Sequence, residues 1–207
     1  MNRLEVNIMF SLKSPYHVSA DRVSFGVDKA ICLDPRDNRI FIPATSLKGI
    51  IRHNLESTLN HKNKKSCIAP KPENMCNECN ICKFFGSPKN KALLLFEDAR
   101  VEETELSSRM GVAIERRRKT AKEDHLFSYE IGFGKRFSTK IRGFFSKDND
   151  AITACVLLYI GAKLGFALGA GKSRGLGWVN IEDFNTFING KEIFIDEINK
   201  KTMELLQ

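Results

Sequence analysis

The sequence predicts an α+β fold with a ferredoxin-like, RNA-recognition-motif core of the order βαββαβ, and three observations support this class. Patterns typical of a strand, a helix, two strands, a helix and a strand follow one another along the 207 residues. Two segments, 61–90 and 101–130, interrupt this order because they are rich in charged residues or cysteine and lack apolar periodicity. No apolar run reaches the ~18 residues that a membrane helix requires, since Lys163 interrupts the longest candidate. We therefore expect one domain over residues 1–207 with two insertions.

The N-terminal part of the chain begins with a strand. Leu4, Val6, Ile8 and Phe10 alternate with polar residues, which indicates a strand with one buried face. Residues 34–38 read Asp-Pro-Arg-Asp-Asn, a composition typical of a hairpin turn, and short apolar runs flank them. We therefore expect a core strand and then a small hairpin before the first helix.

The first predicted helix follows Pro43 and is capped by Thr45 or Ser46. Lys48, Arg52 and Glu56 are expected on its polar face. Because Lys48 and Arg52 are four residues apart, the two cations could bind neighbouring phosphates together. The alternative is that they are ordinary solvated charges. The apolar face is formed by Leu47, Ile50, Ile51, Leu55 and Leu59.

The insertion at residues 61–90 contains a candidate zinc site. Cys76, Cys79 and Cys82 are each separated by two residues, and Cys67 precedes them. Four thiolates in a short segment without its own apolar core are what a structural zinc site needs. His61 is an alternative to Cys67 as the fourth ligand. Disulfides or unused thiols are the other interpretation, which a reducing compartment disfavours.

The middle of the chain combines predicted strands with a charged segment. Residues 93–99 are apolar enough to form a central strand. Residues 102–125 are charged, with Arg-Arg-Arg-Lys at 116–119, which favours a projecting hairpin or a mobile loop. Strand-like alternation returns at 127–131 and 136–145.

The C-terminal part completes the predicted core. Residues 148–165 indicate a helix, and residues 178–181 indicate the last core strand. A small hairpin around Asn189-Gly190 and a short C-terminal helix are expected to follow.

The segment between these two elements is a glycine-rich loop from Gly165 to Gly177. It has almost no side-chain bulk, yet Lys172, Ser173 and Arg174 lie within it, so its amides and cations could lie against a phosphodiester backbone. The alternative is a turn whose geometry is too tight for side chains. It is not a phosphate-binding loop of the Walker type, because the required spacing is absent.

The net charge supports a polyanionic partner. The 33 Lys and Arg residues exceed the 25 Asp and Glu residues, which gives a net charge of +8 and favours nucleic acid over a membrane. The first residues enter a strand pattern directly and do not resemble a signal peptide, so we expect a cytoplasmic protein.

Several segments resemble the RAMP superfamily of CRISPR systems. Residues 168–179, Leu-Gly-Ala-Gly-Lys-Ser-Arg-Gly-Leu-Gly-Trp-Val, are similar to its C-terminal glycine-rich signature. Residues 42–52, Ile-Pro-Ala-Thr-Ser-Leu-Lys-Gly-Ile-Ile-Arg, resemble the first-helix motif of backbone subunits of type III effector complexes. Further blocks similar to that subunit are 82–87, 96–99 and 114–116.

The resemblance is closest to the repeated, target-RNA-cleaving subunit of the type III-A complex, with other type III subtypes left open. It implies that several copies line a guide CRISPR RNA beside other subunits and cut complementary target RNA. Asp28 matches the catalytic aspartate, which acts with Mg²⁺ or another divalent cation such as Mn²⁺. The insertion at 101–130 would be a thumb-like hairpin, with Glu115 where the family usually has aspartate. The implied RNA-binding residues are His17, Lys48, Arg52, Arg116, Arg117, Gly169, Gly171, Lys172, Ser173 and Arg174.

Two other functions are compatible with these residues. One is an RNA-scaffolding RAMP subunit that performs no chemistry. The other is a guide-processing endoribonuclease that cuts without metal and uses His17, His53 or His125 as a general acid or base. The zinc-binding insertion and the surroundings of Asp28 argue against the second.

Overall fold

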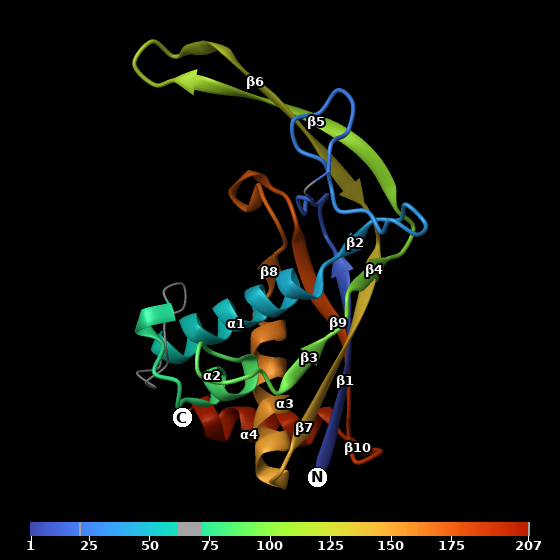
Figure 1. The fold of residues 1–207 in the computed structure, drawn as a ribbon, viewed down its shortest axis with the longest axis vertical. Helices are drawn as coiled ribbons and strands as arrows, with labels where there is room; N and C mark the ends of the chain where they lie inside the picture. The colour runs from blue at the N-terminus through green and yellow to red at the C-terminus, as the bar shows by residue number, and fades with distance from the viewer. Residues whose placement is uncertain (21, 62–71, 207) are drawn as a thin grey trace.

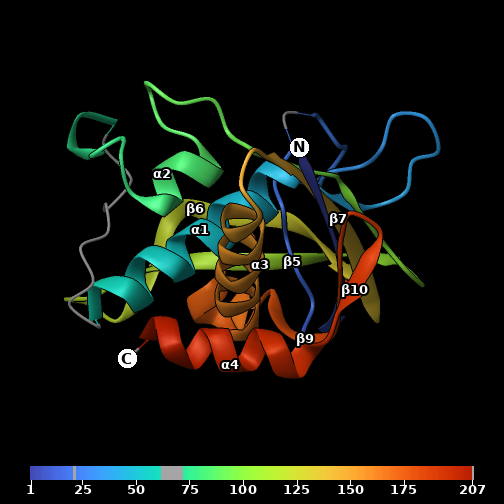
Figure 2. The ribbon, with the colours of Figure 1, turned by 90° about the horizontal axis from the view of Figure 1, so that it is seen from below.

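An antiparallel sheet runs the length of the body of the protein, below the β5–β6 hairpin, and the helices cover one of its faces (Figure 1, Figure 2). The computed structural model describes residues 1–20, 22–61 and 72–206. The strand order is β10-β9-β1-β7-β4-β2, with β3 added to β7 and β8 added to β9. The strands are β1 (Asn2–Leu12), β2 (Phe41–Ile42), β3 (Leu94–Phe96), β4 (Ala99–Val101), β7 (Arg136–Phe145), β8 (Phe166–Ala167), β9 (Trp178–Ile188) and β10 (Lys191–Ile193).

The expected first strand is the centre of this sheet. β1 pairs with β7 on one side and with β9 on the other. Leu4, Val6, Ile8 and Phe10 are fully buried under the helices, while the residues between them are less buried on the other face. The alternation in the sequence therefore located a core strand correctly. With its antiparallel sheet and helices on one face, the fold is α+β and consistent with an RNA-recognition-motif-like arrangement.

Helices α1 (Ala44–His61), α3 (Asp148–Lys163) and α4 (Ile195–Leu206) form the covering layer, with the short helix α2 (Asn80–Phe85) beside α1. α3 is buried almost all round because the sheet lies on one side of it and α1 and α4 pack against it elsewhere. Gly161 allows the close approach of α1, since a Cβ there would lie 2.8 Å from the carbonyl oxygen of Ile51. No helix in the described part of the chain is both long enough and apolar enough to cross a membrane.

The predicted cap of the first helix is wrong. The helix begins at Ala44, before both Thr45 and Ser46. The backbone N–H of Ala44 donates to Oδ1 of Asp98 at 2.7 Å, so the capping carboxylate comes from the segment between β3 and β4. A cap contributed from a distant segment leaves no local signal in the sequence.

The predicted central strand at 93–99 is interrupted, and only its second part, β4, lies between two other strands. The segment forms two short strands, β3 and β4, separated by Glu97 and Asp98. Both pair with β7, and β3 pairs with no other strand in the described part of the chain. Leu95 is 54% exposed, because it lies on the sheet face that no helix covers.

The insertion at 61–90 was expected to lack core residues, and its C-terminal end does not. A short 3-10 helix, Pro72–Asn74, precedes Cys76. Ile81, Phe84 and Phe85 of α2 are buried in the main core. The ring of Phe84 packs edge-on against Phe145 of β7, with 5.5 Å between the ring centroids. The end of the insertion is therefore part of the core.

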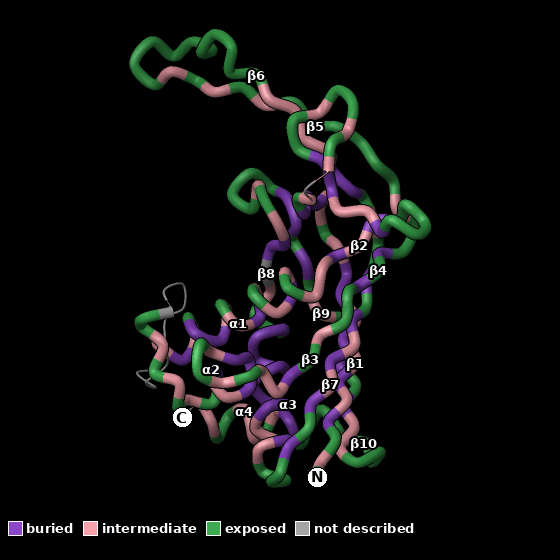
Figure 3. The backbone as a smooth tube through the Cα atoms, viewed as in Figure 1, coloured by how far each residue is buried: buried purple, intermediate pink, exposed green. Residues whose placement is uncertain are grey.

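The charged segment after β4 is a hairpin, one of the two forms expected. β5 (Glu105–Glu115) and β6 (Thr120–Phe133) form a separate two-stranded sheet that projects from the body and is mostly exposed (Figure 1, Figure 3). β6 also includes the strand expected at 127–131, so the root of the hairpin packs on the body. The small hairpin at Asn189-Gly190 is confirmed between β9 and β10.

Candidate functional site

The glycine-rich loop joins β8 to β9 and is held by backbone contacts. The N–H of Ala170 donates to the carbonyl oxygen of His17 at 2.9 Å, and that of Gly177 donates to the carbonyl oxygen of Pro15 at 2.7 Å. At Gly169, with φ +69°, a Cβ would lie 1.9 Å from the carbonyl oxygen of His17. A Cβ at Gly177 would lie 2.1 Å from the carbonyl oxygen of Leu168. The tight-turn interpretation therefore explains these two glycines.

The middle of the loop is different, because it is exposed. Lys172, Ser173 and Arg174 form one turn of 3-10 helix, with Gly171 and Gly175 in left-handed conformations on either side. Arg174 lies over the ring of Phe127 in β6, with 5.9 Å from Cζ to the ring centroid. The predicted cations are thus displayed to solvent on a constrained turn beside the root of the hairpin.

His17 lies beneath this loop. Its side chain is 1% exposed. Nδ1 lies 2.5 Å from the carbonyl oxygen of Glu130, and Nε2 lies 2.8 Å from Oγ of Ser19. Its ring packs edge-on against Tyr129 of β6. Both ring nitrogens have partners inside the protein, so the ring joins the loop region to the hairpin, and RNA binding by His17 stays a prediction.

Asp28 is exposed and is held against β6 by Ser128. The backbone N–H of Ser128 donates to Oδ2 of Asp28 at 2.6 Å, and Ser128 Oγ lies 3.2 Å from the same oxygen. In return, the N–H of Asp28 donates to the carbonyl oxygen of Ser128 at 3.0 Å. Among the described residues Oδ1 has no hydrogen-bond partner, so one carboxylate oxygen faces solvent in a fixed position.

A second carboxylate, Glu130, fastens the segment that carries Asp28. Oε1 of Glu130 accepts from Ser24 Oγ at 2.7 Å, and Oε2 accepts from the N–H of Ile31 at 2.8 Å and from Arg22 at 2.5 Å. Burial by itself raises the pKa of Glu130, but these hydrogen bonds and the charge of Arg22 lower it overall. A Glu130 that stays ionised holds both ends of residues 24–31 to the hairpin.

Strand β6 separates the glycine-rich loop from Asp28. Phe127 and Ser128 are consecutive in β6, so their side chains point to opposite faces of the hairpin. Arg174 contacts Phe127, whereas Asp28 contacts Ser128. The cationic loop and the carboxylate therefore approach the root of the hairpin from different faces.

Arg52 does not lie on a solvated face of α1, contrary to expectation. Its Nε lies 2.7 Å from Oε1 of Glu56, and the two side chains are only 14% and 5% exposed. Its Nη1 donates to the carbonyl oxygen of Gly86 at 2.7 Å, and Nη2 lies 3.8 Å from Sδ of Met75. Arg52 therefore links α1 to both ends of the cysteine-containing segment and is not placed to grip a phosphate.

Lys48, one turn earlier, remains a candidate phosphate contact. It is half-buried and makes no ion pair within the described residues. Burial lowers the pKa of Lys48, and the positive charge of Arg52 lowers it further. An incoming phosphate would counteract both effects on the pKa, because its negative charge stabilises the protonated amine.

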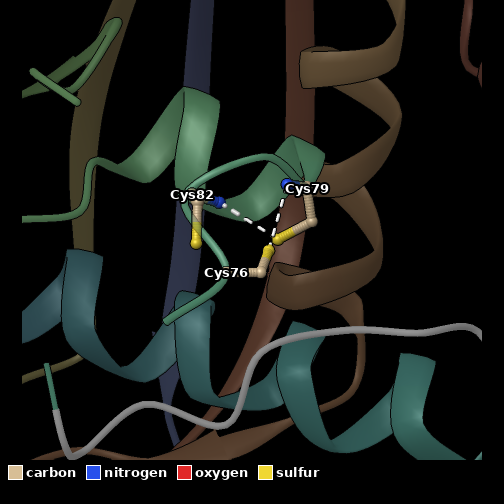
Figure 4. Close-up of side chains that lie close together, drawn as sticks. All are labelled: Cys76, Cys79 and Cys82. Carbon is tan, nitrogen blue, oxygen red and sulfur yellow. Dashed lines mark hydrogen bonds between the residues drawn. The ribbon is translucent and has the colours of Figure 1, made fainter. Parts of the chain in front are cut away.

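Three of the predicted zinc ligands lie together (Figure 4). The Sγ atoms of Cys76, Cys79 and Cys82 are all within 4.8 Å of one another, and tetrahedral zinc with its usual Zn–S bonds requires about 3.8 Å. Cys76 Sγ accepts from the N–H of Cys79 at 3.3 Å, and Cys79 Sγ accepts from the N–H of Cys82 at 3.5 Å. Such bonds favour thiolates, so the group fits a metal ion such as zinc. The predicted fourth ligand Cys67 and the side chain of its alternative, His61, lie outside the described residues.

Arg116 and Arg117 lie in the turn at the tip of the hairpin and are exposed. The strand between Thr120 and Ser128 places this tip about 25 Å from Asp28. The predicted RNA-binding residues therefore fall into three groups. One lies beside the root of the hairpin, the second is at its tip, and the third, Lys48 and Arg52, is on α1.

The sequence profile of the RAMP superfamily matches residues 9–180, which is most of the chain. This chain is a member of the RAMP superfamily. RAMP proteins typically bind CRISPR RNA and form multi-subunit complexes, and the family includes RNA endonucleases. The match begins at residue 9, within β1, and spans Asp28, the hairpin and the glycine-rich loop, whereas β10 and α4 lie beyond it. No curated protein matches the chain.

Within this RAMP protein, sequence patterns did not identify Ser128 and Glu130 as site residues. Both belong to a strand whose alternation is all that the sequence reveals. Ser128 contacts Asp28 across 100 positions of the sequence, and Glu130 contacts Ser24 across 106 positions. No local pattern records such pairings.

Proposed function

We propose that this RAMP protein is a guide-RNA-binding backbone subunit of a type III CRISPR effector complex and that it cleaves target RNA paired with the guide. The observation that supports this most directly is the position of Asp28. Its carboxylate is exposed yet held in place by Ser128, at the root of the hairpin and across β6 from the cationic loop. The strand order β9-β1-β7-β4 with helices on one face supports a ferredoxin-like core for the single domain 1–207.

The two faces of the hairpin suggest a division of labour. Exposed Lys172, Ser173 and Arg174 and the open amides near Gly171 contact the guide backbone from one face. Lys48 extends this track along α1, and Arg116 and Arg117 reach the RNA with the hairpin tip. Gly169 shapes the loop and leaves its amides in place. Guide base pairing then selects the target, because these cations meet phosphates and not bases.

Asp28 acts on the target strand from the other face. Its solvent-facing oxygen, Oδ1, would hold a divalent cation or position the ribose hydroxyl that attacks the scissile phosphate. A divalent cation bound there supplies Lewis-acid stabilisation of the phosphate, with RNA oxygens as further ligands. Ser128 keeps the carboxylate from turning away. Several copies stack along the guide beside other type III subunits, and the zinc centre orders the insertion that supports α1.

Two alternatives are less well supported. A guide-processing nuclease that uses His17 would need an accessible ring, and this ring is buried with both nitrogens bonded. In a scaffold without chemistry, Asp28 would only fasten its segment to Ser128 through Oδ2, and its solvent-facing Oδ1 would have no role. The test below separates cleavage from scaffolding.

The test uses the assembled complex loaded with guide RNA and an end-labelled complementary target. Asp28→Asn should abolish regularly spaced cuts while leaving target binding within about twofold, because the amide keeps the shape of the side chain but cannot act as the anion. Asp183→Asn, an exposed aspartate on β9, is the matched control and should cut normally. Unchanged cutting by Asp28→Asn would disprove the catalytic assignment.

Metal dependence is measured in the same assay. A chelator should stop cutting, added Mg²⁺ or Mn²⁺ should restore it, and zinc content measured in parallel should stay constant. Cutting that continues without divalent cations, with Asp28→Asn also active, would overturn both the metal dependence and the catalytic role of Asp28.

A further inference from the structure

The turn directly before Asp28 displays two bare apolar side chains. Phe25 is 106% exposed and Val23 is 97% exposed, and Phe25 is the most exposed aromatic side chain in the described part of the chain. Apolar side chains held in water contribute nothing to folding, since the hydrophobic effect stabilises only those that are buried. Neither side chain supports the core, so their exposure requires another explanation.

The turn that carries Phe25 is fixed at both sides. Within it, the N–H of Val27 faces the carbonyl oxygen of Ser24 at 3.4 Å, and Gly26 takes a left-handed φ of +79°. Outside it, Ser24 Oγ donates to Glu130 at 2.7 Å, and the carbonyl oxygen of Gly26 lies 3.2 Å from Ser128 Oγ. The phenyl ring is thus displayed by a braced turn, which lowers the entropy cost of using it as a contact.

The position of the turn identifies the ligand. Phe25 precedes Asp28 by three residues, a span of at most about 10 Å even for extended chain. The same two β6 residues, Ser128 and Glu130, hold the turn and the carboxylate. Any strand whose phosphate reaches Asp28 therefore passes within reach of the turn that carries Phe25.

A nucleobase fits this surface better than a protein does. A stable protein interface buries about 800 Å² on each partner, which two side chains of this size cannot supply. A single aromatic ring is enough to stack one base, and stacking tolerates any sequence because every base has a flat face. The exposed cation Lys29, which directly follows Asp28, also favours a phosphate-bearing ligand over an apolar one.

We propose that Phe25 is a stacking platform for a target-strand nucleobase next to the phosphate at Asp28, and that it sets the register of cutting. This inference rests on the proposed function for its substrate. Stacking fixes the nucleotide beside the scissile bond, so the attacking hydroxyl and the phosphate are held in line. The contact is aromatic in character, so an aliphatic side chain of similar size cannot replace it.

The experiment is photo-cross-linking in the guide-loaded complex with Asp28→Asn, which keeps the target intact. Targets carry 5-iodouridine at one position at a time, and cross-linked peptides are identified by mass spectrometry. The peptide containing Phe25 should cross-link at nucleotides that flank each cut site and at few others. Phe25→Trp should retain this cross-link, and Phe25→Leu should lose it.

Cleavage by the Asp28-containing complex gives the second readout. Phe25→Leu should slow single-turnover cutting by about 5-fold to 100-fold and blur the cut position, with guide loading unchanged, because base–aromatic stacking has that range of strength. Phe194→Leu, an exposed phenylalanine between β10 and α4, is the matched control and should cut normally.

The outcomes separate this inference from the proposed function. A Phe25 cross-link at cut sites together with active Asp28→Asn keeps the platform and removes the catalytic aspartate. Normal cutting by Phe25→Leu, or cross-links spread evenly over the target, overturns the platform. Failure of Phe25→Leu to assemble with its neighbours also overturns it, because the turn then contacts protein.

Discussion

Asp28 and Ser128 exchange backbone and side-chain hydrogen bonds: the N–H of Ser128 donates to Asp28 Oδ2 at 2.6 Å, and the N–H of Asp28 donates to the carbonyl oxygen of Ser128 at 3.0 Å. This pairing joins the segment before β2 to the root of the hairpin. A movement of the hairpin therefore moves the carboxylate with it.

Ser128→Ala tests that relationship. The backbone bonds remain and the hydroxyl contacts with Asp28 and Gly26 are lost, so target cutting should fall by about 2-fold to 10-fold, the equivalent of one hydrogen bond of 0.5–1.5 kcal/mol to the carboxylate. The melting temperature should change little, because Ser128 is only half-buried and its backbone pairing with Asp28 is kept. Single-turnover cleavage and thermal unfolding measure the two effects. A loss of stability without a loss of cutting would contradict a positioning role for Ser128.

Arg52→Met should unfold the protein more easily and not simply weaken RNA binding. It leaves the buried carboxylate of Glu56 without its guanidinium, which typically costs about 3–5 kcal/mol. Urea unfolding measures this loss, and Arg52→Met combined with Glu56→Leu should recover part of it. The matched control, Lys48→Gln on the same helix, should weaken guide binding and leave unfolding nearly unchanged. If Arg52→Met weakened guide binding and left unfolding unchanged, Arg52 would be an RNA-binding residue after all.

Removal of the metal should destabilise the core as well as the insertion. Cys79 and Cys82 are continuous with α2, whose Phe84 packs on β7. Cys79→Ser should lower the bound zinc, measured by atomic absorption, and lower the melting temperature. Cys32→Ser, a half-buried cysteine outside the group, should retain both. Full zinc content in Cys79→Ser would show that this thiol is not a ligand.

Stability should fall in acid partly through Asp34. Hydrogen bonds from Arg36, and then the charges of Arg36 and Arg100, hold the pKa of Asp34 well below its usual range. A depressed folded-state pKa means that the stabilisation is fully present above the unfolded value of about 3.9 and is lost as the pH falls below it. Asp34→Asn should be less stable at pH 7 and show a flatter decline between pH 4 and pH 2 in urea titrations. An unchanged slope would contradict this role, and Asp196→Asn in α4 is the control.

Gly169→Ala should displace the glycine-rich loop. Residue 169 has a left-handed backbone, and an added Cβ there would overlap the carbonyl oxygen of His17. The loss of folding free energy should therefore exceed the ~1–2 kcal/mol that a left-handed conformation alone costs a residue with a side chain. Gly175→Ala shares the left-handed φ but has open space around it, so it isolates the conformational cost. Thermal unfolding and guide-RNA affinity should both suffer more in Gly169→Ala. Equal losses of stability and affinity in the two variants would mean that the backbone at His17 moves aside at little cost.

Local patterns in the sequence were sufficient to predict those elements whose structure depends mainly on neighbouring residues. The alternation from Leu4 to Phe10 identified the central strand, and the cysteine spacing brought three ligands together because one short turn and one helix contain them all. The glycine-rich loop and its exposed cations were likewise readable, since backbone conformation and charge are properties of the segment itself.

The tertiary structure alone decided which partner each polar group meets. Asp98 caps α1, Arg52 pairs with Glu56 and donates to the carbonyl oxygen of Gly86, and His17 is buried. Each of these contacts depends on packing between segments far apart in the chain, where burial forces polar groups to find partners. The sequence by itself thus determined the family's core, its loop and its thiol cluster, while the folded chain determined that Asp28 is held by Ser128 beside an exposed Phe25.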